Sequence, residues 1–125
     1  MKRDMELIRK ILLEIEKDDK GIGFYQITSM NGYSYDELYL HLCLMDDAGF
    51  FNKVQKDLSG GFMYDRLTNR GYDFLETIRN DEVWEETKKE VEKKKLPKTI
   101  ETIVGVAGYF IGKVMKGYLG GADGK

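Results

Sequence analysis

The first twenty residues place apolar side chains at the spacing of an amphipathic helix. Charged residues separate the members of this apolar stripe, which are Leu7, Ile8, Ile11, Leu12 and Ile15. Asp4 stands where an N-cap is expected, and Gly21 and Gly23 are expected to stop the helix. The pattern predicts a helix over residues 4–19 that buries one face and leaves the other in solvent.

A second helix is predicted over residues 34–49. Ser34 and Glu37 have the spacing of a capping box, and Gly49 follows the last periodic position. The apolar face consists of Leu38, Leu42, Met45 and Ala48. The preceding residues 23–29 are rich in β-forming types and predict a short strand, with a turn between the strand and the helix.

The middle of the chain has the pattern of a β-hairpin followed by a helix. Residues 50–56 and 62–67 are rich in β-forming types, and residues 57–61 between them have turn chemistry. Thr68 is expected to cap the helix that follows. The apolar face of that helix consists of Tyr72, Leu75 and Ile78.

Two further helices are predicted towards the C-terminus. Asn80 or Asp81 is expected to cap the first of them, which ends before Pro97. Its thin apolar stripe consists of Val83, Thr87 and Val91, with Trp84 beside it. Thr99 is expected to cap the last helix, over residues 100–119.

The order helix, strand, helix, hairpin, helix indicates an α+β fold of the winged-helix type with a C-terminal helical extension. The usual winged helix has two helices between the first strand and the hairpin, whereas this chain has room for one. We predict a winged-helix-like domain over residues 1–96. We also predict a C-terminal helix over residues 97–119, used for packing or dimerisation, and a disordered tail over residues 120–125.

Composition and charge narrow the possible functions. The 125 residues are 42% apolar and 34% charged, which suits one folded domain, and the net charge of −2 weighs against a dedicated nucleic-acid binder. A single cysteine excludes an internal disulfide, and with no secretory segment at the start we expect a cytoplasmic protein. One His and one Cys cannot form the usual zinc site, so we expect no metal and no cofactor.

Several stretches resemble known proteins. "HLCLMDDAGFF" and "MYDRLTNRGYDFL" resemble the junctions that join the recognition helix, wing and following helix of winged-helix proteins. "MKRDMELIRKILLEIE", "GYSYDELYLHL" and "LTNRGYDFLETIRNDEVWEETK" are similar to the small proteins catalogued as domain of unknown function 2513, found in Firmicutes and their phages. The resemblance covers about residues 1–90 and implies a winged-helix-like fold in a phage or prophage setting. It implies no activity and no functional residue.

The helix at residues 34–49 is the candidate functional element. In a DNA reader its exposed N-terminal half would meet base edges, but this helix has four carboxylates and no Lys or Arg. Exposed aromatic residues are typical anchors of protein interfaces. We therefore predict that a host or phage protein binds to Tyr33, Tyr35, Asp36, Glu37, Tyr39 and Leu40. One version of this hypothesis is an inhibitor of a host nucleic-acid-handling or antiviral defence enzyme.

The alternative is a DNA-binding transcriptional regulator. Its contacts to duplex DNA would come from Lys53, Lys56, Arg66 and Arg70. Catalysis is not expected, because His41 and Cys43 point in different directions on a helix and no further His or Cys is available. We expect His41 to pack where the helix meets the wing, and we expect no small-molecule substrate.

The last helix has an unusual composition. Apolar residues run from Ile103 to Ile111, a stretch too short to span a bilayer, and Gly105, Gly108 and Gly112 lie on one side. Three interpretations stay open for residues 100–119. The helix packs on the first helix, pairs with the same helix of a second copy in a homodimer, or lies on a membrane surface.

Overall fold

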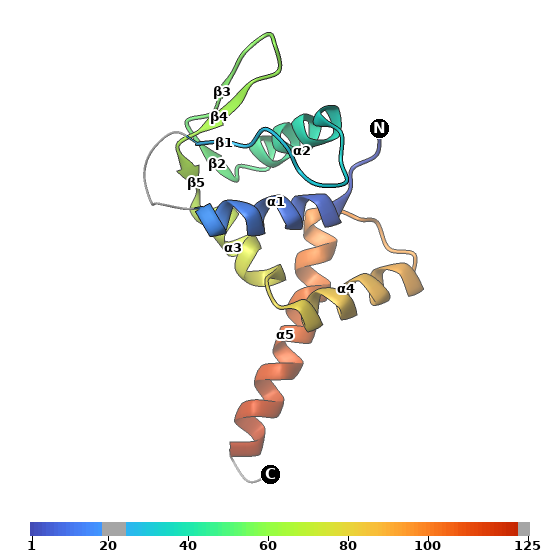
Figure 1. The fold of residues 1–125 in the computed structure, drawn as a ribbon. Helices are drawn as coiled ribbons and strands as arrows, with labels where there is room; N and C mark the ends of the chain where they lie inside the picture. The colour runs from blue at the N-terminus through green and yellow to red at the C-terminus, as the bar shows by residue number, and fades with distance from the viewer. Residues whose placement is uncertain (19–24, 123–125) are drawn as a thin grey trace. The chain divides into compact units, whose positions relative to one another are not determined.

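In the computed structural model, residues 1–18 and 25–122 are described, with side chains as far as Gly117. They form helices and short antiparallel strands (Figure 1), which confirms the predicted α+β class. Backbone contacts divide the chain into two compact units, Met1–Leu75 and Glu76–Lys125.

Helix α1 (Met5–Asp18) of the first unit begins where the sequence predicts. The Asp4 carboxylate accepts hydrogen bonds from the backbone N–H groups of Glu6, at 2.9 Å, and Leu7, at 3.4 Å. These bonds satisfy two N–H groups that have no partner within the helix, so Asp4 is the N-cap. The predicted apolar stripe is buried throughout: Leu7, Ile8, Ile11, Leu12 and Ile15.

Helix α2 (Tyr35–Asp47) carries the predicted capping box. The Ser34 hydroxyl accepts from the Glu37 N–H at 3.1 Å, and the Glu37 carboxylate accepts from the Ser34 N–H at 2.9 Å. At the other end Gly49 has a φ of +81°, the left-handed conformation that ends helices. Leu38, Leu42 and Met45 are fully buried, so this helix contributes one face to the core.

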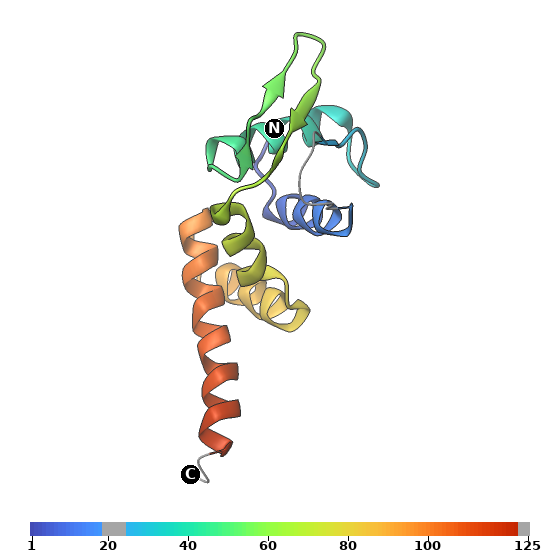
Figure 2. The ribbon, with the colours of Figure 1, turned by 90° about the vertical axis from the view of Figure 1, so that its left-hand side faces the viewer.

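The hairpin follows α2 and bends into two paired segments. Near the helices, β2 (Phe51–Asn52) pairs with β5 (Arg66–Leu67). Further out, β3 (Gln55–Lys56) pairs with β4 (Phe62–Tyr64), and β1 (Tyr25–Gln26) joins the other side of β4 to complete the order β1-β4-β3. The outer part of the hairpin projects beyond α1 and α2 (Figure 2).

Rings from the hairpin extend the core of the first unit. The Phe51 ring centroid lies 5.2 Å from that of Phe62 and 4.7 Å from that of Tyr64, and all three side chains are buried. Aromatic residues bury more apolar area than any other type, which is how a sheet of two- and three-residue strands gains enough contact to hold.

Residues 23–24 of the predicted strand lie outside the described part, and among residues 25–29 the strand is shorter than expected. The structure has β1 only at Tyr25–Gln26, followed by a turn in which the Tyr33 N–H donates to the Met30 carbonyl at 3.1 Å. Tyr25 pairs with Tyr64 of β4, and Gln26 pairs with Met63. Residues 25–34 contain no helix, and the predicted stop signals Gly21 and Gly23 lie outside the described residues.

Helix α3 (Asn69–Ile78) crosses the division between the two units. Thr68 caps it as predicted, because its hydroxyl accepts from the Gly71 N–H at 3.2 Å. The same hydroxyl donates to the Gly49 carbonyl. One threonine therefore links the end of α2 to the start of α3.

The second unit contains α4 (Asp81–Lys93) and α5 (Ile100–Ala122). The Asn80 side chain caps α4 by accepting from the Val83 N–H at 3.0 Å, and Thr99 caps α5 by accepting from the Thr102 N–H at 3.1 Å. The predicted stripe of α4 is buried: Val83, Trp84, Thr87 and Val91. Helix α5 packs against α4, and its fully buried side chains are Ile103 and Ala107.

The structure differs from the predicted organisation at two places. Backbone contacts group α4 with α5, whereas the sequence suggested a division after residue 96. The predicted tail over residues 120–125 is too long, because α5 continues to Ala122, and residues 123–125 lie outside the described part. Glycine lowers helix propensity but keeps its backbone N–H, so glycine at these positions does not stop a helix as proline does.

Candidate partner-binding surface on helix α2

The outward face of α2 consists of Asp36, Leu40, Cys43 and Asp47. These positions lie opposite the buried side of the helix, which holds Leu38, His41, Leu42 and Met45. Asp36 and Asp47 are exposed, and Leu40 and Cys43 are half-buried. The face is therefore an apolar strip between two carboxylates.

Two of the predicted anchor tyrosines lie beside this face, and one of them contacts the hairpin. The Tyr35 hydroxyl donates a hydrogen bond to the carbonyl of Gly60 at the hairpin tip, and its ring centroid lies 6.1 Å from that of Tyr39. Tyr35 is 38% exposed, whereas Tyr39 is half-buried and partial burial raises the pKa of its phenol. Tyr35 therefore links the hairpin tip to α2, and Tyr39 packs beside the Tyr35 ring.

Two other residues predicted to bind a partner, Tyr33 and Glu37, lie away from the outward face of α2. Tyr33 is half-buried, and the Lys10 ammonium lies 5.3 Å from the centroid of its ring. The Glu37 carboxylate is held by the capping box. Of the six residues predicted to bind a partner, Asp36 and Leu40 are the two on the outward face.

The four predicted DNA-contacting cations do not act as one group. Lys56 forms an ion pair with Asp46 of α2 at 3.1 Å, and this hydrogen bond is the main reason that the pKa of Lys56 is raised. Lys53, Arg66 and Arg70 are exposed. The Arg66 guanidinium donates to the Leu67 carbonyl at 3.1 Å. Lys56 is therefore paired with α2, the helix that a winged-helix DNA-binding protein would insert into the duplex, and is not free to contact phosphate.

His41 has a structural position that differs from the expected one. Its side chain is 1% exposed, and Nε2 accepts a hydrogen bond from the Asp4 backbone N–H at 2.8 Å. Nδ1–H donates to the Glu37 carbonyl at 2.7 Å. The imidazole therefore joins α2 to the start of α1 and not to the wing, because that backbone N–H has no partner within α1.

No metal or catalytic cluster is found among the residues that the structure describes. None of their His, Cys, Asp and Glu side chains form a group of three that could hold a metal ion. Both ring nitrogens of His41 already have partners, and Cys43 is half-buried on the opposite side of α2. Within the described residues, no helix is long and apolar enough to cross a bilayer.

The hairpin tip over residues 57–61, predicted only as a turn, is held together by one side chain. The Asp57 carboxylate accepts from the N–H groups of Ser59, at 3.0 Å, and Gly61, at 2.8 Å. It also accepts from the Ser59 hydroxyl at 2.7 Å. The spacing Asp-Leu-Ser-Gly-Gly is typical of an Asx-type turn and could have indicated this role. Leu58 is fully exposed at this tip.

Acidification is expected to loosen the tip. Hydrogen bonds from Ser59 and Gly61 lower the pKa of Asp57, so its stabilising effect is present above the unfolded pKa, about 4, and is lost as the pH falls through the folded value. We expect the protection of the Gly61 amide, measured by NMR as its exchange rate relative to that of an unstructured amide at the same pH, to fall below this range. Asp57→Asn should give fast exchange at neutral pH, and equal exchange in both proteins would contradict this role.

Similarity to known proteins extends over most of the chain. Residues 2–97 match the family described as "Hypothetical protein (DUF2513)". An "Uncharacterized protein" of Haemophilus influenzae is 30% identical over 117 residues, which cover 92% of this chain and 99% of that relative. No solved structure matches the chain. The extent of the family match shows that this protein belongs to the DUF2513 family.

Proposed function

We propose that this protein is a non-enzymatic protein-binding module and that the outward face of α2 is its binding surface. Asp47 is the observation that carries this proposal. It is an exposed carboxylate in the last turn of α2, where the partial negative charge of the helix end disfavours an anion. Within the described part of the chain Asp47 forms no ion pair, whereas the neighbouring Asp46 is paired with Lys56. Asp47 attracts the Lys56 ammonium at longer range and helps to raise the pKa of that group. A carboxylate without a direct ion-pair partner at this end of a helix is nevertheless better explained by binding than by folding.

The composition of this face favours a protein over DNA. Leu40 and Cys43 give it an apolar centre, and Asp36 and Asp47 give it a charged rim, which is the arrangement of protein interfaces. Phosphates would be repelled by both carboxylates. The Lys side chain that reaches this helix, Lys56, is already paired.

The finer parts of the proposal concern fold type and setting. The order α1, β1, α2, hairpin, α3 agrees with a winged helix that lacks one of its usual helices. We propose that this protein is a winged helix of that reduced type, that it belongs to a phage or prophage, and that it acts on a host protein in the cytoplasm. An enzyme that handles nucleic acids, including a defence enzyme, would offer a cationic surface to which the two carboxylates are complementary.

The variant Asp47→Lys distinguishes a role of Asp47 in partner binding from a role in stability. A cation at a helix C-terminus is favourable, whereas loss of the attraction between Asp47 and Lys56 is not, so we expect the free energy of unfolding to change by less than about 0.5 kcal/mol. We expect partner capture from a host lysate, quantified by mass spectrometry on the tagged full chain, to fall at least about tenfold, in line with the cost of an unfavourable interface charge. Leu40→Glu should also abolish capture.

Glu86→Lys is the matched control, because it makes the same charge change at an exposed position of α4. This variant should retain every partner of the parent protein. Capture that is unchanged in Asp47→Lys and Leu40→Glu would show that the outward face of α2 is not the binding surface.

The rival function is a DNA-binding regulator that uses the exposed cations Lys53, Arg66 and Arg70. It predicts binding to duplex DNA from the protein's own locus that weakens steeply with salt. Fluorescence polarisation at low salt measures this directly. Our proposal predicts no saturable binding at micromolar protein, and binding that is lost in Arg66→Ala and Arg70→Ala would favour the regulator.

A further inference from the structure

Helix α5 presents an exposed face opposite its contact with α4. Three large apolar side chains are exposed on it: Val104 at 40%, Tyr109 at 62% and Met115 at 55%. A fourth, Val114 at 60%, lies on the side of the helix that holds Ile103 and Ala107. Gly105, Gly108 and Gly112 lie between them along the helix. Apolar exposure of this kind on one helix marks an interaction surface.

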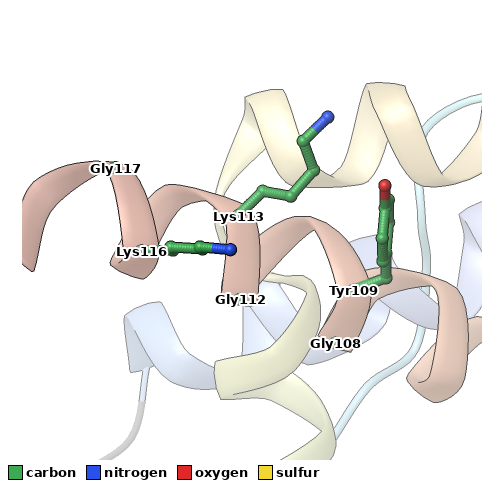
Figure 3. A pocket seen from close by; sticks show the side chains of 6 residues that line it. All are labelled: Gly108, Tyr109, Gly112, Lys113, Lys116 and Gly117. Atoms are coloured by element: carbon green, nitrogen blue, oxygen red, sulfur yellow. The ribbon is translucent and has the colours of Figure 1, made fainter. Parts of the chain in front are cut away.

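The glycines leave a hollow in this face. Figure 3 shows the side chains of Tyr109, Lys113 and Lys116 standing out from the helix beside Gly108 and Gly112. The hollow has a volume of about 660 Å³. A methyl group added at Gly105, Gly108 or Gly112 would meet nothing within 4 Å, so packing inside the described chain does not require glycine at these positions. Glycine also disfavours a helix interior, which points to a need for close approach from outside.

We propose that the exposed face of α5 binds the same face of a second copy of this chain, with the two helices antiparallel. The charges on the face support this arrangement. Glu101 is exposed near the start of α5, and Lys113 and Lys116 are exposed towards its end. The face is therefore complementary to itself when one helix is reversed, and repulsive when the two helices run in parallel.

The spacing of the residues fits a two-fold axis between Gly108 and Tyr109. In that register Gly105 lies opposite the partner's Gly112, and Glu101 lies opposite the partner's Lys116. Both pairs occur twice in a symmetric dimer. The stretch from Glu101 to Lys116 is about 22 Å long at the usual helical rise, and the glycines let the two backbones approach along its middle.

This inference does not depend on the proposed function of α2. The residues belong to a different helix and a different compact unit. Failure of the α2 variants to lose their partner would leave the α5 pairing intact, and a monomeric full chain would leave the α2 proposal intact.

Charge reversal in the full chain tests the pairing. Sedimentation equilibrium should show a reversible dimer for the parent protein. Glu101→Lys and Lys116→Glu should each raise the dissociation constant about tenfold, because each breaks two ion pairs and creates repulsion. The double variant should recover the parent value, because it restores both pairs in reverse.

Gly108→Leu provides a second test. A Cβ atom at Gly108 meets no other part of the chain within 4 Å, and leucine favours a helix more than glycine does, so the helix content by circular dichroism should not fall. The added side chain blocks close approach of a second helix, so the protein should be a monomer. A parent protein that is a monomer at about 100 μM would overturn the proposal, as would a dimer that all of these variants retain. Flotation of a monomeric parent with phosphatidylserine vesicles would identify a membrane surface as the occupant instead and would equally overturn it.

Discussion

Replacement of His41 by alanine is expected to lower the free energy of unfolding by about 3 kcal/mol. The imidazole is 1% exposed and hydrogen-bonded through both nitrogens, so alanine leaves a cavity and removes the partner of the Asp4 N–H. Urea unfolding followed by circular dichroism measures the change. The loss is large because the ring is buried and both of its hydrogen bonds are lost together.

Two further variants separate the contribution of the His41 hydrogen bonds from that of the volume of its side chain. His41→Leu fills most of the space but makes neither hydrogen bond, so we expect it to retain about half of the loss. Cys43→Ala changes a half-buried position of the same helix and should cost less than about 1 kcal/mol. Stability within about 0.5 kcal/mol of the parent for both His41 variants would show that the link contributes little.

Replacement of Gly71 by alanine is expected to destabilise the chain by about 2 kcal/mol. A Cβ atom at this position would lie 2.7 Å from the carbonyl oxygen of Phe50 and 3.3 Å from Cδ2 of Leu67. The first contact is with backbone, which cannot rotate away, so α3 or the start of β2 must shift. In a helix with open space around the glycine, the same substitution would raise the stability, because alanine favours a helix more than glycine does. A loss of stability in Gly71→Ala therefore indicates that the backbone of Phe50 lies close to Gly71.

Gly117→Ala is the control for this prediction. Nothing lies within 4 Å of a Cβ atom built at Gly117, so this variant should be neutral or gain up to about 1 kcal/mol in helix propensity. Thermal and urea unfolding of the two variants should therefore shift in opposite directions. A stabilised Gly71→Ala variant would contradict the packing of α3 against Phe50.

Local features of this fold were readable from the sequence. Asp4, Ser34, Thr68, Asn80 and Thr99 are all caps, as their spacing predicts. A cap depends on side chains and N–H groups two or three residues apart, so the chemistry that forms it is visible in a short stretch of sequence. The buried stripes of α1 and α4 follow from periodicity for the same reason.

Contacts between segments that are far apart in the chain could not be predicted from the sequence. The Tyr35 hydroxyl meets Gly60, and His41 meets the backbone of Asp4, at separations of 25 and 37 residues. Such bonds depend on how a hairpin and two helices are placed in space, which no local pattern encodes. The sequence therefore does not show which tyrosines of the predicted surface are used inside the chain, and the structure assigns Tyr35 to the hairpin tip and Tyr39 to the Tyr35 ring.

The structure also narrows the candidate surface. The sequence pointed to the N-terminal half of the helix, with its tyrosines. The described side chains shift the candidate to the outward face, where Leu40 lies between Asp36 and Asp47. Asp47 lay outside the predicted set because its unpaired state depends on the ion pair between Asp46 and Lys56.

A photo-crosslinking amino acid in place of Leu40 tests the binding claim most directly, because it reports what lies against α2 in the cell. With the same amino acid at Glu86 as reference, we predict a discrete crosslinked protein from position 40 alone. Its identity would follow from mass spectrometry. Crosslinks from position 40 to nucleic acid, or the same products from both positions, would contradict the account.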